Sequence, residues 1–203
     1  MKEENDMFHV IGDIHGKFNA YTKLISTMST SIQLGDFGIG FTDIPEIPAQ
    51  HTFLRGNHDN PFLCQQNPNW IKDGTILFDG RVMVIGGADS IDVDYRVAGV
   101  DWWAEEQLSY QELNALIDLY EQVKPDVMLT HDAPFSIVSN MYPMVKTSSR
   151  TNQAFDTMRN IHQPKQWLFG HHHRTMTTFA DGTLYKCLGE LDSTVVDLNN
   201  LSE

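Results

Sequence analysis

Side chains that can bind metal ions recur along the chain in five short blocks. In order, these are Asp13-Ile14-His15, Gly35-Asp36, Gly56-Asn57-His58-Asp59, His131, and Gly170-His171-His172-His173. Imidazole suits transition metals and carboxylate suits hard cations, so a mixture of the two is typical of Mn, Fe or Zn sites with positions left open for water and substrate. A site of Cys alone would instead indicate a structural metal. The blocks together predict one binuclear metal site.

Each block follows a stretch whose composition predicts a buried strand. These stretches are residues 8–11, 31–34, 52–54, 127–130 and 166–169. If such strands lie side by side, their carboxyl ends meet at one edge, where catalytic groups usually collect in an α/β sheet. We therefore expect blocks that are far apart in the sequence to form a single site.

The remaining sequence predicts helices and short strands around these blocks. A helix is expected after Gly16, a second from the capping box at residues 109–112 to Pro125, and a third over residues 153–162. Asp79-Gly80 should form the two-residue turn of a hairpin. Short strands over residues 176–179, 183–188 and 194–198 should close the chain.

In their order and spacing, the five blocks resemble the calcineurin-like metallophosphoesterases, whose pattern runs DxH, GD, GNH(D/E), H and GHxH. The resemblance spans residues 9–173. It implies an α/β protein of the metallophosphoesterase type, a four-layer α/β/β/α sandwich in which two mixed sheets are flanked by helices.

The resemblance also implies a role for each donor. One metal ion would be held by Asp13, His15 and His173, the other by Asn57, His131 and His171, and Asp36 would bridge the two. Two dications about 3.5–4 Å apart repel each other, and a shared carboxylate and a shared hydroxide offset that repulsion. The hydroxide is the expected nucleophile. Two divalent transition-metal ions are thus the expected cofactors, with Mn favoured and Fe, Zn and Ni as alternatives.

His58 lies beside a metal ligand but outside the ligand set, and the resemblance implies that it protonates the leaving group as general acid. Together with Asp36 it is the expected catalytic residue. Its orientation would come from Asp59, from Asp43 or from a backbone carbonyl. His172 fills the variable position of the last block, where we expect it to point away from the metals, with a substrate contact as the alternative.

A second polar cluster follows the strand expected at residues 82–85. It runs from Gly86-Gly87 to Trp102-Trp103 and resembles a segment of small bacterial and phage-encoded family members. Arg96 in this loop is expected either to bind the substrate phosphate, alongside Asn57 and His172, or to pair with a neighbouring aspartate. The two tryptophans are expected to be core anchors, with base stacking as the alternative.

The segment after Gly35-Asp36 departs from the protein-phosphatase branch of the family. Members of that branch carry a second Asp and an Arg there, whereas this chain has Ile39 in place of the Asp and no Arg follows. This departure weakens the alternative of a phosphoprotein (Ser/Thr) phosphatase, although the sequences around His15 and His58 resemble that branch closely. Faster turnover of a phosphopeptide than of a simple aryl phosphate would support it.

Length and composition predict a single domain over residues 1–203, which the resemblance implies is a metallophosphoesterase domain. The chain is 41% hydrophobic and 20% charged, which suits one large core. It has no run of eighteen apolar residues and no apolar leader, so we expect no membrane span, no secretory signal and a cytoplasmic location. The formal net charge of −13 disfavours stable binding to duplex nucleic acid. The oligomeric state is left open.

These observations predict an enzyme that hydrolyses phosphate mono- or diesters of a nucleotide or another small phosphorylated compound. Cleavage of short oligonucleotides or cyclic nucleotides is an alternative within the same chemistry. An alternative of another class is a catalytically inactive protein-interaction scaffold. Retention of all seven metal donors and of His58 argues against it. Whether Arg55 or Arg96 touches substrate is left open.

Overall fold

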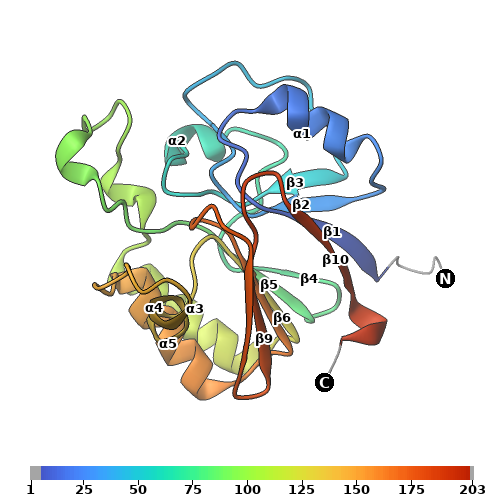
Figure 1. Cartoon of the computed structure of the whole chain (residues 1–203), viewed down its shortest axis with the longest axis vertical. Coiled ribbons are helices and arrows are strands. Elements are labelled where there is room, and N and C mark those ends of the chain that lie inside the picture. Colours follow the sequence, from blue (N-terminus) through green and yellow to red (C-terminus); the bar gives the residue numbers. More distant parts are fainter. Residues whose placement is uncertain (1–5, 202–203) are drawn as a thin grey trace.

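Two sheets lie at the centre of the computed structural model, which describes residues 6–201 (Figure 1). The first sheet has the strand order β10-β1-β2-β3. Its strands are β1 (Met7–Ile11), β2 (Ser31–Gln33), β3 (His51–Phe53) and β10 (Ser193–Asp197). β1, β2 and β3 are parallel, and β10 runs antiparallel to β1, so this sheet is mixed.

The second sheet is also mixed and has the order β4-β5-β6-β7-β9-β8. Its strands are β4 (Thr75–Leu77), β5 (Val82–Ile85), β6 (Val127–Thr130), β7 (Gln166–Phe169), β8 (Met176–Ala180) and β9 (Thr183–Cys187). The four central strands are parallel, and the edge strands β4 and β8 are antiparallel to their neighbours. The carboxyl ends of β6 and β7 therefore lie at one edge of this sheet.

Helices cover the outer face of each sheet (Figure 1). The first sheet is covered by α1 (Phe18–Ile25) and α2 (Pro61–Cys64), and the second by α3 (Tyr110–Val123), α4 (Phe135–Met141) and α5 (Arg150–Ile161). Short 3-10 helices are η1 (Val93–Tyr95), η2 (Ala104–Glu106) and η3 (Leu198–Asn200). The resulting four layers confirm the expected fold class. Helix α4 was not expected from the sequence.

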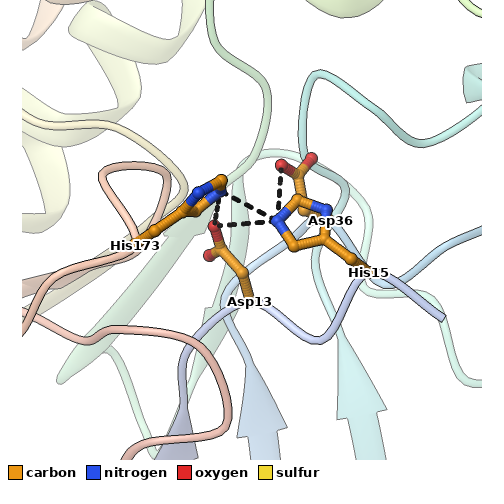
Figure 2. Close-up of side chains that lie close together, drawn as sticks. All are labelled: Asp13, His15, Asp36 and His173. Carbon is orange, nitrogen blue, oxygen red and sulfur yellow. Dashed lines mark hydrogen bonds and ion pairs between the residues drawn. The ribbon is translucent and has the colours of Figure 1, made fainter. Parts of the chain in front are cut away.

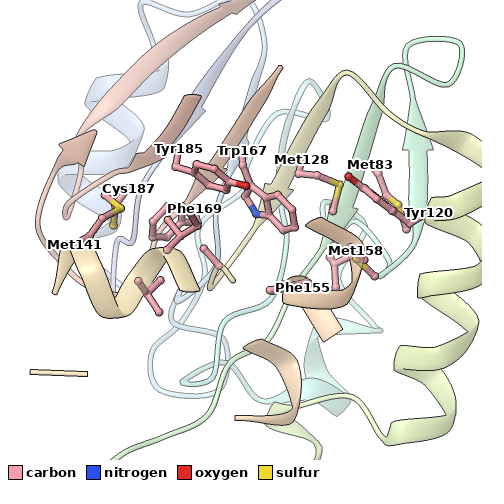
Figure 3. Packing of buried hydrophobic residues seen from close by; sticks show 14 of the residues in the cluster. Met83, Tyr120, Met128, Met141, Phe155, Met158, Trp167, Phe169, Tyr185 and Cys187 are labelled. Carbon is pink, nitrogen blue, oxygen red and sulfur yellow. The ribbon is translucent and has the colours of Figure 1, made fainter. Parts of the chain in front are cut away.

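Three apolar clusters hold these layers together. Between the sheets, Val10 and Ile32 of the first sheet pack with Val84, Leu129 and Leu168 of the second. A second cluster joins α1 to the outer face of the first sheet. The third joins helices α3, α4 and α5 to the second sheet and is shown in Figure 3. Because these residues leave water almost completely, the clusters supply the main favourable term in folding.

Local sequence signals explain where several elements begin. The capping box of Ser109 and Glu112 is present at the start of α3, as expected. Helix α5 begins three residues earlier than expected because Ser149 and Asn152 form a second capping box. The hairpin between β4 and β5 is confirmed, but its expected two-residue turn is wrong. Leu77 pairs with Val82, so residues 78–81 form the turn.

Within residues 6–201, none of the helices combines the length and the apolar composition that a membrane crossing requires. The two expected core anchors at the end of the second polar cluster differ in exposure. Trp103 is buried and packs its ring edge-on against Phe41, whereas Trp102 is only partly buried.

Candidate metal centre

Four side chains from three strand ends meet in a first donor set (Figure 2). The donor atoms of Asp13, His15, Asp36 and His173 all lie within 4.8 Å of one another. The Nε2 atoms of His15 and His173 are 2.8 Å apart, and Nε2 of His173 lies 3.2 Å from Oδ2 of Asp13. Imidazole nitrogens and carboxylate oxygens that converge on one point are suited to hold a divalent cation.

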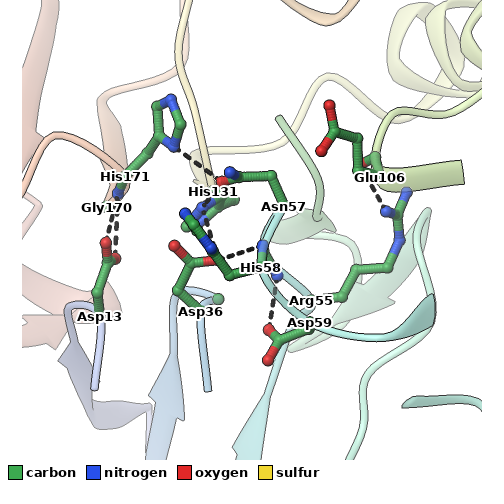
Figure 4. Close-up of polar contacts among 12 residues, drawn as sticks. Asp13, Asp36, Arg55, Asn57, His58, Asp59, Glu106, His131, Gly170 and His171 are labelled. Atoms are coloured by element: carbon green, nitrogen blue, oxygen red, sulfur yellow. Dashed lines mark hydrogen bonds and ion pairs between the residues drawn. The ribbon is translucent and has the colours of Figure 1, made fainter. Parts of the chain in front are cut away.

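A second donor set lies on the other side of Asp36 (Figure 4). Oδ1 of Asn57 is 3.0 Å from Nε2 of His131 and 3.0 Å from Nδ1 of His171. Oδ1 of Asp36 is 3.4 Å from Nε2 of His131. The other ring nitrogen of His131, Nδ1, lies 2.6 Å from the carbonyl oxygen of Leu34, to which it donates. That bond directs Nε2 at the donor set, where the neutral ring would offer its lone pair to a cation.

Asp36 lies between the two sets and turns one oxygen toward each. Oδ2 lies 3.8 Å from Nε2 of His15, while Oδ1 faces His131 and accepts the backbone N–H of His58 at 2.9 Å. The carboxylate is fully buried, and Oδ2 has no hydrogen-bond partner among the described residues. A buried, unpaired carboxylate oxygen is costly unless a cation compensates it. The residues present therefore fit a pair of divalent cations.

The backbone conformation brings the donors together. His15, Asp36, His171 and His173 all have positive φ angles, of 45°, 54°, 67° and 53°. Residues other than glycine rarely adopt this left-handed region, and such strain is typical of functional sites. Each of these donors lies in the turn that follows a strand, so the strained turn re-aims its side chain at the sheet edge.

Two glycines allow backbone to approach the donors closely. A Cβ atom on Gly56 would lie 2.0 Å from Oδ1 of Asp36, and one on Gly170 would lie 2.2 Å from Oδ1 of Asp13. Neither distance is sterically tolerable, because the contacted atoms are themselves fixed in the site. Gly56 is thus required by the close approach of Asp36, and Gly170 by that of Asp13.

Asp59 joins two of the blocks through its carboxylate. It accepts backbone N–H bonds from Phe37, Gly38, Ile39 and Gly56 at 2.7–3.0 Å. These bonds use the side chain fully, so Asp59 fixes the loops after β2 and β3 instead of contacting the His58 ring. Asp43, the other carboxylate expected to be able to orient His58, is exposed, and within residues 6–201 it forms no hydrogen bond or ion pair with His58.

The ring of His58 is contacted by Arg96. Nη1 of Arg96 lies 2.8 Å from Nδ1 of His58, and Nη2 lies 3.1 Å from Nε2. The same guanidinium donates to both carboxylate oxygens of Asp92, from Nε at 2.7 Å and from Nη2 at 2.8 Å. Burial lowers the pKa of His58, Asp36 opposes that shift, and the positive charge of Arg96 adds to it.

His172 points toward Asp132. Its Nε2 lies 3.2 Å from Oδ1 of that carboxylate, and its ring stacks on Tyr142 with 4.4 Å between the ring centroids. Asn152 holds the other carboxylate oxygen at 2.6 Å. His172 still lines the cleft, beside His171.

Arg55, whose contacts the sequence left open, faces away from the cleft into the protein. It is 4% exposed, donates from Nε to Asp73 at 2.9 Å, and donates from Nη1 to the carbonyl oxygens of Glu105 and Glu106. Its role in this structure is to join the third block to the end of the second polar cluster.

Charge and burial shift two imidazole pKa values in opposite directions. Burial alone lowers the pKa of His131, but the charge and proximity of Asp36, together with the charge of Asp13 and the bond to Leu34, raise it by more, so the net shift is upward. Burial lowers the pKa of His171 to about 4, against the opposing charge of Asp132. At neutral pH and without metal, His131 is therefore protonated and His171 neutral, and a cation would have to displace the proton of His131.

The donors open into a cleft of about 610 Å³, whose lining includes Asp36, Asn57 and His58. Its walls come from two loops that carry Ile91 and Met144, which are 94% and 89% exposed.

Sequence reasoning overlooked Glu190, whose Oε1 lies 3.9 Å from Nε2 of His15. Glu190 follows strand β9 closely, so the rule that located the other blocks could have found it.

The family model described as calcineurin-like phosphoesterase matches residues 7–175. Among solved structures, TT1561 of Thermus thermophilus is 11% identical with a TM-score of 0.57, covering 97% of this chain and 96% of that one. GAP50, the anchor in the inner membrane complex of Plasmodium, is 8% identical with a TM-score of 0.50, covering 90% and 71%. At these identities the likeness shows the fold alone. No curated protein matches the sequence.

Proposed function

The chain belongs to the calcineurin-like phosphoesterases, a family of hydrolases, and on that premise we propose that it hydrolyses small phosphate mono- or diesters at a binuclear metal centre. The observation that carries the proposal is Asp36, a buried carboxylate with one oxygen toward each donor set and no partner for Oδ2 among the described residues. Such a group fits a bridge between two cations.

Each donor set has a distinct place in this proposal. Asp13, His15 and His173 hold one ion, and Asn57, His131 and His171 hold the other, with Asp36 shared. Two bound dications would activate a water molecule as nucleophile and offset the negative charge of the phosphoryl oxygens. The protein's own contribution is to fix the donors before substrate arrives, through the strained turns and the bond from His131 to Leu34. Mn is the proposed metal.

His58 is the proposed general acid, because it lines the cleft beside both donor sets. In this structure Arg96 covers both of its ring nitrogens. Movement of Arg96 onto the phosphate of a bound substrate would free a ring nitrogen and at the same time supply two donors to the phosphoryl oxygens. Arg96 is therefore a proposed substrate contact, and Asn57 and His172 are proposed as further contacts because they also line the cleft.

The cleft supports a small substrate. Its volume of about 610 Å³ is within the range of sites for small molecules. The exposed side chains of Ile91 and Met144 offer apolar surface to the part of the substrate beyond the phosphate. A nucleoside would satisfy both features, whereas the net charge of −13 disfavours a long duplex.

Rates on four substrates test this function. Metal-stripped protein is resupplied with Mn and assayed on p-nitrophenyl phosphate, bis-p-nitrophenyl phosphate, a 2′,3′-cyclic nucleotide and a phosphopeptide. Preference for the diesters would define a phosphodiesterase, and preference for the small monoester a phosphatase of small compounds. Turnover of the phosphopeptide far above that of the aryl phosphate would replace the proposal with a phosphoprotein phosphatase. Failure to hydrolyse any of the four would support the inactive scaffold.

A further inference from the structure

The amide of Asn57 has to present its oxygen to the second donor set. Oδ1 lies between Nε2 of His131 and Nδ1 of His171, and Nδ2 donates to Oγ of Ser90 at 3.0 Å. Only the oxygen of an amide can bind a cation, because the NH₂ group is a donor. Which way this amide faces therefore decides whether the second set can hold an ion.

The immediate neighbours of Asn57 do not decide its orientation. Metal binding requires His131 to lose its proton, which leaves a lone pair on Nε2. A reversed amide would then donate from Nδ2 to that lone pair, and Ser90 would donate its hydroxyl proton to the amide oxygen. Every partner would then be satisfied without metal, and the second set would be closed by its own hydrogen bonds. Something beyond Ser90 must exclude this arrangement.

Glu106 excludes it by using the only hydroxyl proton of Ser90. Oε2 of Glu106 accepts from Oγ of Ser90 at 2.6 Å, and Oε1 accepts from the backbone N–H of Ser90 at 2.8 Å. A carboxylate is acceptor-only, so the hydroxyl proton points at Glu106 and the hydroxyl lone pair is left for the NH₂ group of Asn57. Ser90 is 5% and Glu106 3% exposed, so solvent does not compete for these bonds.

The backbone of Glu106 is held from the loop that carries Asn57. Arg55 donates to the backbone carbonyl of Glu106 at 2.7 Å, as Figure 4 shows. Arg55 lies two residues before Asn57, so the contacts form a closed circuit. Arg55 binds Glu106, Glu106 binds Ser90, and Ser90 binds Asn57. The polar cluster after β5 thus contributes no metal ligand itself, but it contacts the ligand Asn57 through Ser90.

We propose that Ser90 and Glu106 are positioning residues that lock the Asn57 amide in its metal-binding orientation and so set the affinity of the second metal position. The inference rests on the binuclear function proposed above. It gives the segment between β5 and α3 a task that is separate from substrate contact by Arg96.

Glu106→Gln provides the sharpest test, because glutamine has the shape of glutamate but reverses the donor and acceptor roles in the hydrogen bonds that run through Ser90 to Asn57. The backbone N–H of Ser90 is a fixed donor, so it must take the new amide oxygen, and the new NH₂ group must donate to the Ser90 hydroxyl. The hydroxyl proton then turns to Asn57, which has to offer its oxygen to Ser90. We expect a loss of roughly 10- to 100-fold in Mn affinity at one of the two positions, as is typical for changes behind a metal ligand.

A second substitution should reverse that loss. In the double variant Asn57→Asp/Glu106→Gln, the residue at position 57 has an oxygen on both sides, so it can accept from Ser90 and still face the second set. The two changes also leave the formal charge of the protein as it was. We expect the double variant to bind two Mn ions again, whereas Ser90→Ala should lose affinity because it removes the acceptor for the Asn57 NH₂ group.

The chain contains a matched control pair. Ser109 and Glu112 at the start of α3 also have a hydroxyl-to-carboxylate distance of 2.6 Å, and they belong to a helix cap instead of the metal centre. Ser109→Ala and Glu112→Gln should destabilise the protein modestly and leave both Mn affinities unchanged. Melting temperatures of the metal-free variants give the corresponding measure of folding.

Isothermal titration and metal analysis of the full chain, loaded with Mn alone, give the outcome for all variants. If the natural sequence binds two ions and Ser90→Ala and Glu106→Gln bind both as tightly, the inference is wrong and the proposed function stands. If Glu106→Gln lowers the Mn affinity and the double variant does not restore it, Glu106 does not act by setting the orientation of the Asn57 amide, and the inference is wrong. If the natural sequence binds fewer than two ions, the binuclear function falls together with the inference.

Discussion

The substitution Asp36→Asn should weaken metal binding, while the metal-free protein should be as stable as the natural protein or more stable. In the structure Oδ1 accepts the backbone N–H of His58, and an asparagine keeps that bond because it retains Oδ1. The NH₂ group replaces Oδ2, the oxygen that has no hydrogen-bond partner among the described residues. The change therefore removes a buried charge and breaks no hydrogen bond of the Asp36 side chain.

The effect on the metal-free protein follows from the charge balance. Asp36 and protonated His131 form a buried pair, and His131 can lose its proton once the carboxylate is gone, since Asp36 is what raises its pKa. No uncompensated charge is left behind. Replacement of buried ion pairs by well-packed hydrophobic residues is often neutral or stabilising by about 1–4 kcal/mol, and the loss of both buried charges here acts in the same direction. For a protein of this size, each kcal/mol corresponds to roughly 2–4 °C in Tm.

The effect on the metal-loaded protein has the opposite sign. An ion present at 100 times its Kd stabilises the folded state by about 2.7 kcal/mol, and the variant should lose much of this because asparagine carries no charge to bridge two cations. Thermal melts of both proteins in EDTA and in excess Mn measure the two effects. We expect the variant to melt at or above the natural protein in EDTA and below it in Mn. A variant that melts lower in EDTA, yet gains as much from Mn as the natural protein, would refute the bridging assignment.

Three further predictions concern proton transfer. His58→Ala should slow hydrolysis of an ester with a poor leaving group far more than one with a good leaving group, and equal losses measured on the two esters would remove His58 as the acid. Arg96→Gln removes a cation that lowers the pKa of His58, so the alkaline limb of the pH–rate profile, where the protonated acid is lost, should move to higher pH; an unchanged limb would separate Arg96 from His58. Because the pKa of His131 is raised and a metal ion has to displace its proton, Mn affinity should rise about tenfold per pH unit around neutrality. Calorimetric titration in buffers of different ionisation enthalpy measures the proton release. A Mn affinity that does not depend on pH would contradict the protonated state of His131.

The strand-end blocks could be located from the sequence because each depends on local information. Asp13, Asp36 and His131 closely follow apolar runs, and parallel strands necessarily bring their carboxyl ends together. The capping box of Ser109 is likewise contained in four residues. The fold class and the neighbourhood of the donors follow from such signals.

Other contacts could not be predicted because they join segments whose separation is fixed only by the fold. Glu106 reaches Ser90 across sixteen residues, and Arg96 reaches His58 across thirty-eight. Neither distance has a periodicity that a sequence pattern could reveal. Asp59 is a further example. Because it is next to His58 in the sequence, it was expected to orient the His58 ring, but its carboxylate accepts backbone N–H bonds from the loop after β2.

Each donor set takes its members from both sheets. Asp13 and His15 follow β1 of the first sheet, whereas His173 follows β7 of the second, and the second set likewise combines Asn57 after β3 with His131 after β6. Bound ions would therefore act as cross-links between the two halves of the sandwich, much as a disulfide ties distant parts of a chain. Chelation would then loosen the docking of one sheet on the other, and the whole scaffold, not only the cleft, would exchange its amide hydrogens faster.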